Sequence, residues 1–190
     1  MFRKRNAMVE MVAGLCWTVM LTVLLGASLQ FTIFRMSAAF VEDALAASNL
    51  ASMLIDVEAY GKTLKMNIIS PEDSYVVFQD ALKYNLNLND QWEAANKNLI
   101  SGPVVIAEYI VYHVDGNDVM WTSLGTEGNG SRIVKDGKGT VCSPDGTVIE
   151  SESVYSRVRY MVRGIRGIEI EAVKEKTVDV VSNLLPEGEE

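Results

Sequence analysis

The stretch Ala7–Phe34, AMVEMVAGLCWTVMLTVLLGASLQFTIF, decides the fold of this chain. Residues 11–34 carry no charged side chain, and no proline interrupts them. As a helix, the stretch would be about 42 Å long, whereas the hydrocarbon core of a bilayer is about 30 Å thick. We therefore predict a transmembrane helix over residues 7–34, with enough length to tilt.

A basic leader, residues 1–6, precedes this helix and contains Arg3, Lys4 and Arg5. Basic residues that flank a membrane helix stay in the cytoplasm, so these three set the topology. The sequence predicts a single-pass protein of the cell membrane, with a cytoplasmic N-terminus and an extracytoplasmic C-terminal domain. A cleaved signal peptide is the alternative, with residues 26–28 (GAS) as the cleavage site. The helical pattern continues through that site, which argues against cleavage.

Glu10 is the unusual residue of the apolar stretch. It lies one turn into the run, where an uncompensated carboxylate is costly. In one interpretation, Glu10 stays near the headgroups and reaches back toward Arg5 or Asn6. In the other, Glu10 needs a partner from another subunit, which would make the helix an assembly element.

Residues 35–66 extend the helical pattern beyond the membrane, because Ala, Leu and Met abound and neither Gly nor Pro occurs before Gly61. Two adjacent stripes follow the helix: Val41, Leu45, Ser48, Ser52 and Ile55 form one, and Phe40, Ala44, Ala47, Ala51 and Leu54 form the other. Gly61, followed by Lys62 and Lys65, is typical of a helix end, so we expect one continuous helix of roughly fifty residues. The stripes would pack onto the chain's own β-domain, onto other subunits, or onto both.

An outer domain, residues 67–185, should begin with a second helix. Ser70 is a good N-cap, Pro71 suits the first helical position, and Glu72 and Asp73 are acids in the first turn. This helix should run to about Tyr84, with four residues facing inward: Tyr75, Phe78, Ala81 and Leu82. Asp90 and Glu93 together suggest another short helical turn.

Period-two patterns then predict an antiparallel sheet. The expected long strands are Val104–Val114, Val119–Leu124, Ser153–Arg163 and Ile168–Val181. Two short strands, Thr140–Cys142 and Thr147–Glu150, should flank a β-turn at Ser143–Gly146. A loop is expected at Gly125–Ser131. One face of the last hairpin should carry Val154, Ser156, Val158, Tyr160 and Val162. The fold class is therefore α+β: a long N-terminal helix followed by a small antiparallel sheet with one or two short helices. The acidic tail, residues 186–190, should be frayed.

The composition argues against several classes of function. The net charge of −8 leaves no basic surface for nucleic acid. The two cysteines are Cys16 and Cys142, and they cannot pair if Cys16 lies in lipid.

Motifs for catalysis or ligand binding are also missing. His113 is the one histidine and falls within a strand, and the Gly-rich loop lacks the ending that cradles phosphate. Asp115, Asn117 and Asp118 do not have the spacing of a calcium-binding EF-hand, so a hairpin turn is the better interpretation. We expect no enzymatic activity, no cofactor and no metal.

A basic leader followed by Ala7-Met-Val-Glu10-Met at the start of a long apolar helix resembles pilin-like proteins. The closest resemblance is to the TadE/TadG minor pseudopilins of tight-adherence pili, where a similar run with a glutamate opens the membrane helix. In such proteins the long helix leads into a small strand-rich domain. Two positions depart from the pattern: Arg5 stands where pilin-like precursors have the Gly before the cleaved bond, and Asn6 replaces the Gly of the TadE-type run.

The resemblance implies a structural component of a surface pilus, secretion machine or other filament. Its partners would be other pilin-like subunits, assembly proteins of the inner membrane and the lipid bilayer. Glu10 would pair with the N-terminal amine of a neighbouring subunit, or with an Arg or Lys side chain if the leader is retained. Two alternatives stay open: a membrane-anchored ligand-binding or sensory ectodomain that acts through a partner protein, and an anchored enzyme.

Overall fold

The structure is a computed structural model that describes residues 2–54, 61, 68, 70–95, 97, 99–164 and 167–180 of the 190, with side chains from Ala7 onward. Its elements are helices α1 (Phe2–Ser52) and α3 (Pro71–Asn85) and strands β1 (Ser101–Asp115), β2 (Asp118–Leu124), β3 (Gly130–Val134), β4 (Ser153–Arg163) and β5 (Glu169–Asp179). The strands form one antiparallel sheet in the order β3-β2-β1-β4-β5. The predicted α+β class is confirmed.

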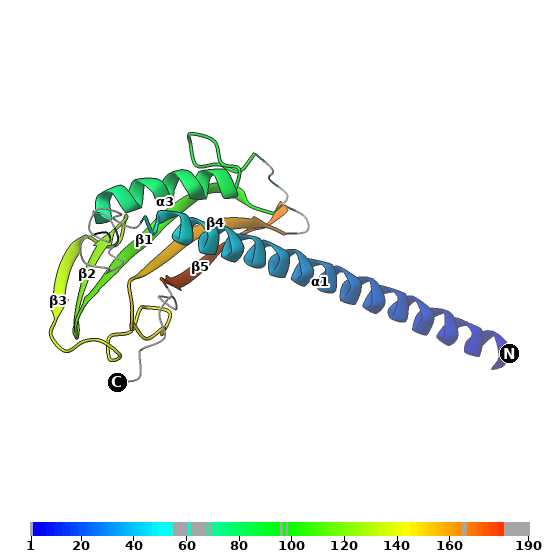
Figure 1. Ribbon diagram of the computed structural model, residues 1–190. Helices are drawn as coiled ribbons and strands as arrows, with labels where there is room; N and C mark the ends of the chain where they lie inside the picture. The colour runs from blue at the N-terminus through cyan, green and yellow to red at the C-terminus, as the bar shows by residue number, and fades with distance from the viewer. Residues whose placement is uncertain are drawn as a thin grey trace.

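Helix α1 has two parts with different surroundings (Figure 1). All side chains from residue 7 to residue 25 are exposed, and this part projects away from the sheet. Beyond it, Val41 and Leu45 are fully buried. Within the described residues, α1 is the one helix long and apolar enough to cross a membrane, which is compatible with a single-pass anchor.

The sheet carries the outer part of α1 together with α3 on one face (Figure 1). The predicted inward face of β4 is confirmed, because all five of its side chains are buried: Val154, Ser156, Val158, Tyr160 and Val162. The four apolar ones share a core with Val41 and Leu45 of α1 and with Phe78 and Leu82 of α3. Four residues of the first stripe, Val41, Leu45, Ser48 and Ser52, are therefore buried in the chain's own domain, and Ile55 lies outside the described residues.

The second stripe of α1 behaves differently. Ala44 is buried, but Phe40, Ala47, Ala51 and Leu54 are exposed.

Helix α3 begins as the sequence predicts. The Ser70 hydroxyl accepts a hydrogen bond from the Asp73 backbone N–H at 3.2 Å, and Pro71 follows directly. Phe78 and Leu82 face the core, while Tyr75 and Ala81 are half-buried. The capping residue thus fixes where this helix starts, and its apolar stripe fixes which face it buries.

A second, smaller core lies on the opposite face of the sheet. Ile110, Tyr112, Val119 and Tyr155 pack there against Ile149, which belongs to the segment between β3 and β4. This segment contains the predicted turn at residues 143–146, closed by the Ser143 carbonyl accepting from the Gly146 N–H at 2.9 Å. Buried side chains on both faces explain why β1 reads as a nearly continuous apolar run.

Two predictions about helices are wrong in detail. Helix α1 ends at Ser52, so the continuous helix expected over residues 35–66 stops early; Met53 and Leu54 are not helical, and Lys62 and Lys65 lie outside the described residues. Asp90 and Glu93 lie in a turn and an isolated bridge with no helix.

The strands also differ from the prediction at two places. The expected loop Gly125–Ser131 already includes the start of β3, which pairs with β2 from Gly130. The expected strands Thr140–Cys142 and Thr147–Glu150 contribute only the isolated bridge between Cys142 and Val148. The tail at residues 186–190 lies outside the described residues.

Candidate functional site

The projecting part of α1 is the candidate interaction site of this chain. Its large apolar side chains are at least half exposed along its length: Met8, Val9, Met11, Val12, Leu15, Trp17, Val19, Met20, Leu21, Val23, Leu24 and Leu25. An apolar helix surface of this length is unstable in water, so it must be covered by lipid or by other protein. Two threonine hydroxyls of this part form hydrogen bonds within the helix: Thr18 donates to the Gly14 carbonyl, and Thr22 donates to the Thr18 carbonyl.

Glu10 lies within this exposed apolar surface, and its side chain is itself exposed. Arg3, Lys4 and Arg5 continue the same helix toward its N-terminus, although the structure does not describe their side chains. Cys16 lies on the same part of the helix, while Cys142 lies in the outer domain, and both are exposed free thiols. The structure therefore places Glu10 where a neighbouring helix or the bilayer would meet it.

An ionic contact ties α1 to the edge of the sheet. Glu42 lies between two lysines of β5, with its carboxylate oxygens 2.6 Å from Lys174 Nζ and 3.2 Å from Lys176 Nζ. Hydrogen bonds from both lysines hold the pKa of Glu42 below its ordinary value of 4.5. The side chains are partly exposed, so the pair orients the helix more than it stabilises it.

Two buried polar contacts fix the same junction. The Ser37 hydroxyl donates to the Leu99 carbonyl at 2.9 Å, and the Asn49 amide donates to the Lys176 carbonyl at 2.9 Å. Ser37 and Asn49 are both fully buried. These bonds pair groups that would otherwise lose their water, so they define one orientation of α1 on the sheet.

A chain of hydroxyl groups surrounds the C-terminal end of α1. Tyr109 donates to the Ser52 hydroxyl at 2.8 Å, and its own oxygen lies 2.7 Å from the Ser74 hydroxyl. Ser74 also lies 2.8 Å from the Ser52 carbonyl, which has no helical partner at this end. Burial raises the pKa of Tyr109 to about 12, so this phenol remains a neutral donor.

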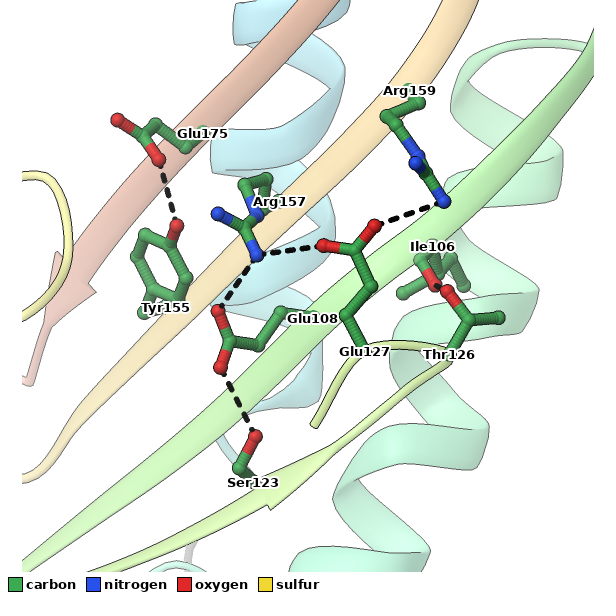
Figure 2. A network of polar contacts seen from close by, with 9 residues as sticks. All are labelled: Ile106, Glu108, Ser123, Thr126, Glu127, Tyr155, Arg157, Arg159 and Glu175. Atoms are coloured by element: carbon green, nitrogen blue, oxygen red, sulfur yellow. Dashed lines mark hydrogen bonds and ion pairs between the residues drawn. The ribbon is translucent and has the colours of Figure 1, made fainter. Parts of the chain in front are cut away.

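Beside the smaller core, the same face of the sheet carries a network of partly exposed charged side chains (Figure 2). Arg157 on β4 lies 2.9 Å from Glu127 and 3.3 Å from Glu108, and Arg159 lies 2.9 Å from Glu127. Ser123 on β2 donates to Glu108 at 3.3 Å. Next to these four charged side chains, the Tyr155 hydroxyl donates to Glu175 on β5 at 2.7 Å, so the network extends to the edge strand (Figure 2).

Glu127 reaches the network because its loop folds back onto β1. The Glu127 N–H donates to the Ala107 carbonyl at 2.9 Å, and Gly125 adopts a φ of 120°. A Cβ at Gly125 would lie 2.9 Å from the Ala107 oxygen, so only glycine fits this position. The Gly-rich loop thus has a packing role, which agrees with its lack of a phosphate-binding ending.

His113 lies on β1 and is partly exposed, as predicted. Its Nδ1 lies 2.7 Å from the Glu152 carboxylate, which also accepts from the Val114 N–H at 2.8 Å. Asp115 and Asp118 face each other across the β1–β2 turn, which confirms the hairpin interpretation of that acidic segment. In the part of the chain that the structure describes, no group of three or more His, Cys, Asp or Glu residues is placed to hold a metal ion.

An open cavity of about 330 Å³ lies between α3, the segment that follows it and β1. Tyr75 and Gln79 of α3 line it together with Trp92. Trp92 has a φ of 61°, and its ring is 4.9 Å from Lys83 Nζ. An aromatic ring beside amide groups can hold a small ligand, and no sequence motif marks this place.

Comparisons with protein-family models, with curated proteins and with solved structures found no match to this chain.

Proposed function

We propose that this chain is a pilin-like, membrane-anchored structural subunit, similar to TadE/TadG minor pseudopilins, without enzymatic activity. The projecting part of α1 holds the subunit in the bilayer and later packs laterally against the helices of other subunits. The outer domain makes the remaining contacts of the assembly. The observation that carries the proposal is the complete exposure of α1 from residue 7 to residue 25, with Glu10 inside this surface.

Glu10 is the residue that favours assembly over simple anchoring. A lone carboxylate costs up to about 3 kcal/mol at the centre of a membrane helix, and less toward its end. A helix that only anchors the chain in the membrane has no use for a carboxylate at this position. A cationic group of a neighbouring subunit would offset it; Arg3, Lys4 and Arg5 supply such groups if the leader is retained.

Substitution of Glu10 tests the assembly role. Two differently tagged copies of the chain are expressed together, and their co-isolation from gently solubilised membranes is measured. We expect Glu10→Ala and Glu10→Gln to reduce co-isolation strongly, because both remove the charge. Glu10→Asp, which keeps the carboxylate at the same position, serves as the control and should retain most of the co-isolation. Undiminished co-isolation of Glu10→Ala and Glu10→Gln would show that the assembly role is wrong.

The mass of the intact mature chain tests the state of the leader. Arg5 replaces the glycine that precedes the cleaved bond in pilin-like precursors, so we expect a retained leader and a mass of 20.9 kDa. A mass lower by the first five or six residues would mean that the leader is processed, and Glu10 would then pair with a new N-terminal amine.

A ligand-binding or sensory ectodomain is the second candidate, and the cavity beside Trp92 is the observation that favours it. In this candidate function, the outer domain would bind the ligand and act through a partner protein. Trp92→Ala separates the two functions. It should leave co-isolation of the tagged copies unchanged if the chain is a structural subunit, whereas loss of signalling with intact assembly would favour the sensor.

A further inference from the structure

The end of β4 lies directly against the apolar part of α1. A Cβ added at Gly164, at the end of β4, would lie 2.6 Å from the amide nitrogen of Gln30. Gln30 belongs to the charge-free run of residues 11–34. One tip of the sheet therefore reaches the same level as the apolar helix (Figure 1).

The position of Gln30 along the helix places this tip at the membrane boundary. About 20 helical residues cross the hydrocarbon core. Counted outward from Met11, they end at Gln30; counted inward from Phe34, they extend to Leu15 and leave Gln30 inside the core. In both registers the turn next to Gln30 lies at or below the outer surface of the hydrocarbon.

The side chains around the tip are apolar and exposed. Ile168, Ile170 and Val173 have exposed fractions of 61%, 47% and 54%. Between this hairpin and α1 runs a groove of about 220 Å³, which Phe34 and Ala38 line from the helix side. The groove begins at Phe34, the last residue of the charge-free run, so it opens at the level where headgroups and acyl chains meet if α1 crosses the bilayer.

The charged groups at this level form a rim around the apolar surface. Arg163 lies 3.4 Å from Glu169 and remains half exposed, and Glu171 is also exposed on β5. Arg35 is the first charged residue after the apolar run, and its guanidinium is 5.6 Å from the Phe31 ring centroid. Arginine side chains at such a boundary reach toward headgroup phosphates while their stems stay in apolar surroundings.

We propose that the end of the β4–β5 hairpin beside Gln30 is a second membrane contact, in which Ile168 and Ile170 enter the boundary between the headgroups and acyl chains of the same bilayer. The occupant of the groove is lipid. Two contacts, the helix and the hairpin tip, then fix the tilt and the rotation of the outer domain above the membrane. The inference rests on α1 crossing the bilayer, but it does not depend on an assembly role for Glu10.

Spin labels on the full chain test the contact. The starting variant carries Cys16→Ser and Cys142→Ser, and Ile168→Cys provides the labelling site. The chain is reconstituted into vesicles of phosphatidylcholine and phosphatidylglycerol. Collision of the label with oxygen, which enters the bilayer, is compared with collision with a water-soluble nickel chelate.

Two further label positions calibrate the measurement. Leu21→Cys lies within the apolar run and reports the bilayer. Tyr84→Cys reports water, because Tyr84 is 86% exposed and its neighbour Asn85 is hydrogen-bonded to Ser48 at 3.0 Å. Ser48 is eighteen residues beyond Gln30, or about 27 Å farther along the helix. All three positions are exposed, so the label should not disturb the fold.

We expect an oxygen-to-nickel collision ratio several-fold higher at position 168 than at position 84, and of the same order as at position 21. A ratio at 168 equal to that at 84, with 21 still in the bilayer, would overturn the hairpin contact and leave the membrane span intact. Water-like ratios at both 168 and 21 would overturn the span and the contact together. Protection from both reagents that disappears on dilution with lipid would assign the surface to a second copy of the chain and contradict the lipid contact.

Discussion

The hydroxyl of Tyr109 connects three elements at one buried point. It joins Ser52 at the end of α1 to Ser74 in α3, and the Tyr109 ring packs against Phe78 with a centroid distance of 4.7 Å. All four residues are fully buried. A polar group in such a place stabilises the fold only while each of its partners is satisfied.

Tyr109→Phe should lower the free energy of unfolding of the outer domain by about 1–2 kcal/mol, because the Ser52 and Ser74 hydroxyls lose a buried partner. Thermal unfolding of the full chain in detergent micelles, followed by circular dichroism, measures the change. Tyr84→Phe removes the same group from a residue that is 86% exposed and should change nothing. Equal stability of the two variants would mean that the hydroxyl chain contributes nothing.

Some of these residues could be found in the sequence and others could not. The core stripe of α1 was predictable, because Val41, Leu45 and Ser48 recur at helical spacing. The charged network was not: Glu108, Glu127 and Arg157 are far apart in the sequence, and only the sheet register brings them together. An acidic chain contains many such residues, and no local pattern distinguishes those that pair.

The C-terminal end of α1 shows where local sequence fails at the scale of elements. Residues beyond Ser52 favour a helix by composition, yet Met53 and Leu54 leave it. Tertiary contacts decide the outcome, since the Ser52 carbonyl lies 2.8 Å from the hydroxyl of Ser74, far along the chain. Strand β3 was not predicted, because its side chains lie mostly on the surface and its sequence therefore lacks an alternation of apolar and polar residues.

The contact between α1 and β5 should depend on pH. The pKa of Glu42 is lowered in the folded chain by hydrogen bonds from Lys174 and Lys176, so the ionised form stabilises the fold above the ordinary carboxyl pKa of 4.5. This contribution is lost as the pH falls through the lowered value. Because the groups are partly exposed, we expect it to be below about 1 kcal/mol and to shrink in high salt.

Glu42→Gln isolates this effect. The variant should be slightly less stable than the unmodified chain at pH 7 and equal to it near pH 3, as measured by chemical unfolding at each pH. Asp43→Asn changes the neighbouring exposed acid and should show no such pH-dependent difference. A constant difference at both pH values would contradict the ionic origin of the contact.

The start of α3 should tolerate only residues that can cap it. Ser70→Ala removes the acceptor for the Asp73 N–H and should cost about 1 kcal/mol of unfolding free energy. Ser70→Asn supplies another capping oxygen and should restore most of the loss. Thermal unfolding of both variants measures the effect, and equal losses in both would show that capping is not the cause.

At the scale of the whole molecule, the chain combines a projecting apolar helix with a folded domain. The net charge of the full sequence is −8. The junction formed by the buried Ser37 and Asn49 and the partly exposed Glu42 makes the domain and the outer part of α1 one packed unit. This arrangement suits a subunit that assembles through its helix and presents its domain outward.

The two native cysteines allow the central claim, a helix in the bilayer with the domain outside, to be measured on the unaltered chain. Cys16 lies in the apolar part of α1 and Cys142 in the outer domain, and both thiols are exposed in the isolated chain. Right-side-out membrane vesicles are treated with a membrane-impermeant maleimide, and the labelled cysteines are identified by peptide mass. We predict labelling of Cys142 alone, with Cys16 reacting only after detergent is added. Labelling of Cys16 in sealed vesicles, or protection of Cys142 until they are opened, would contradict the account.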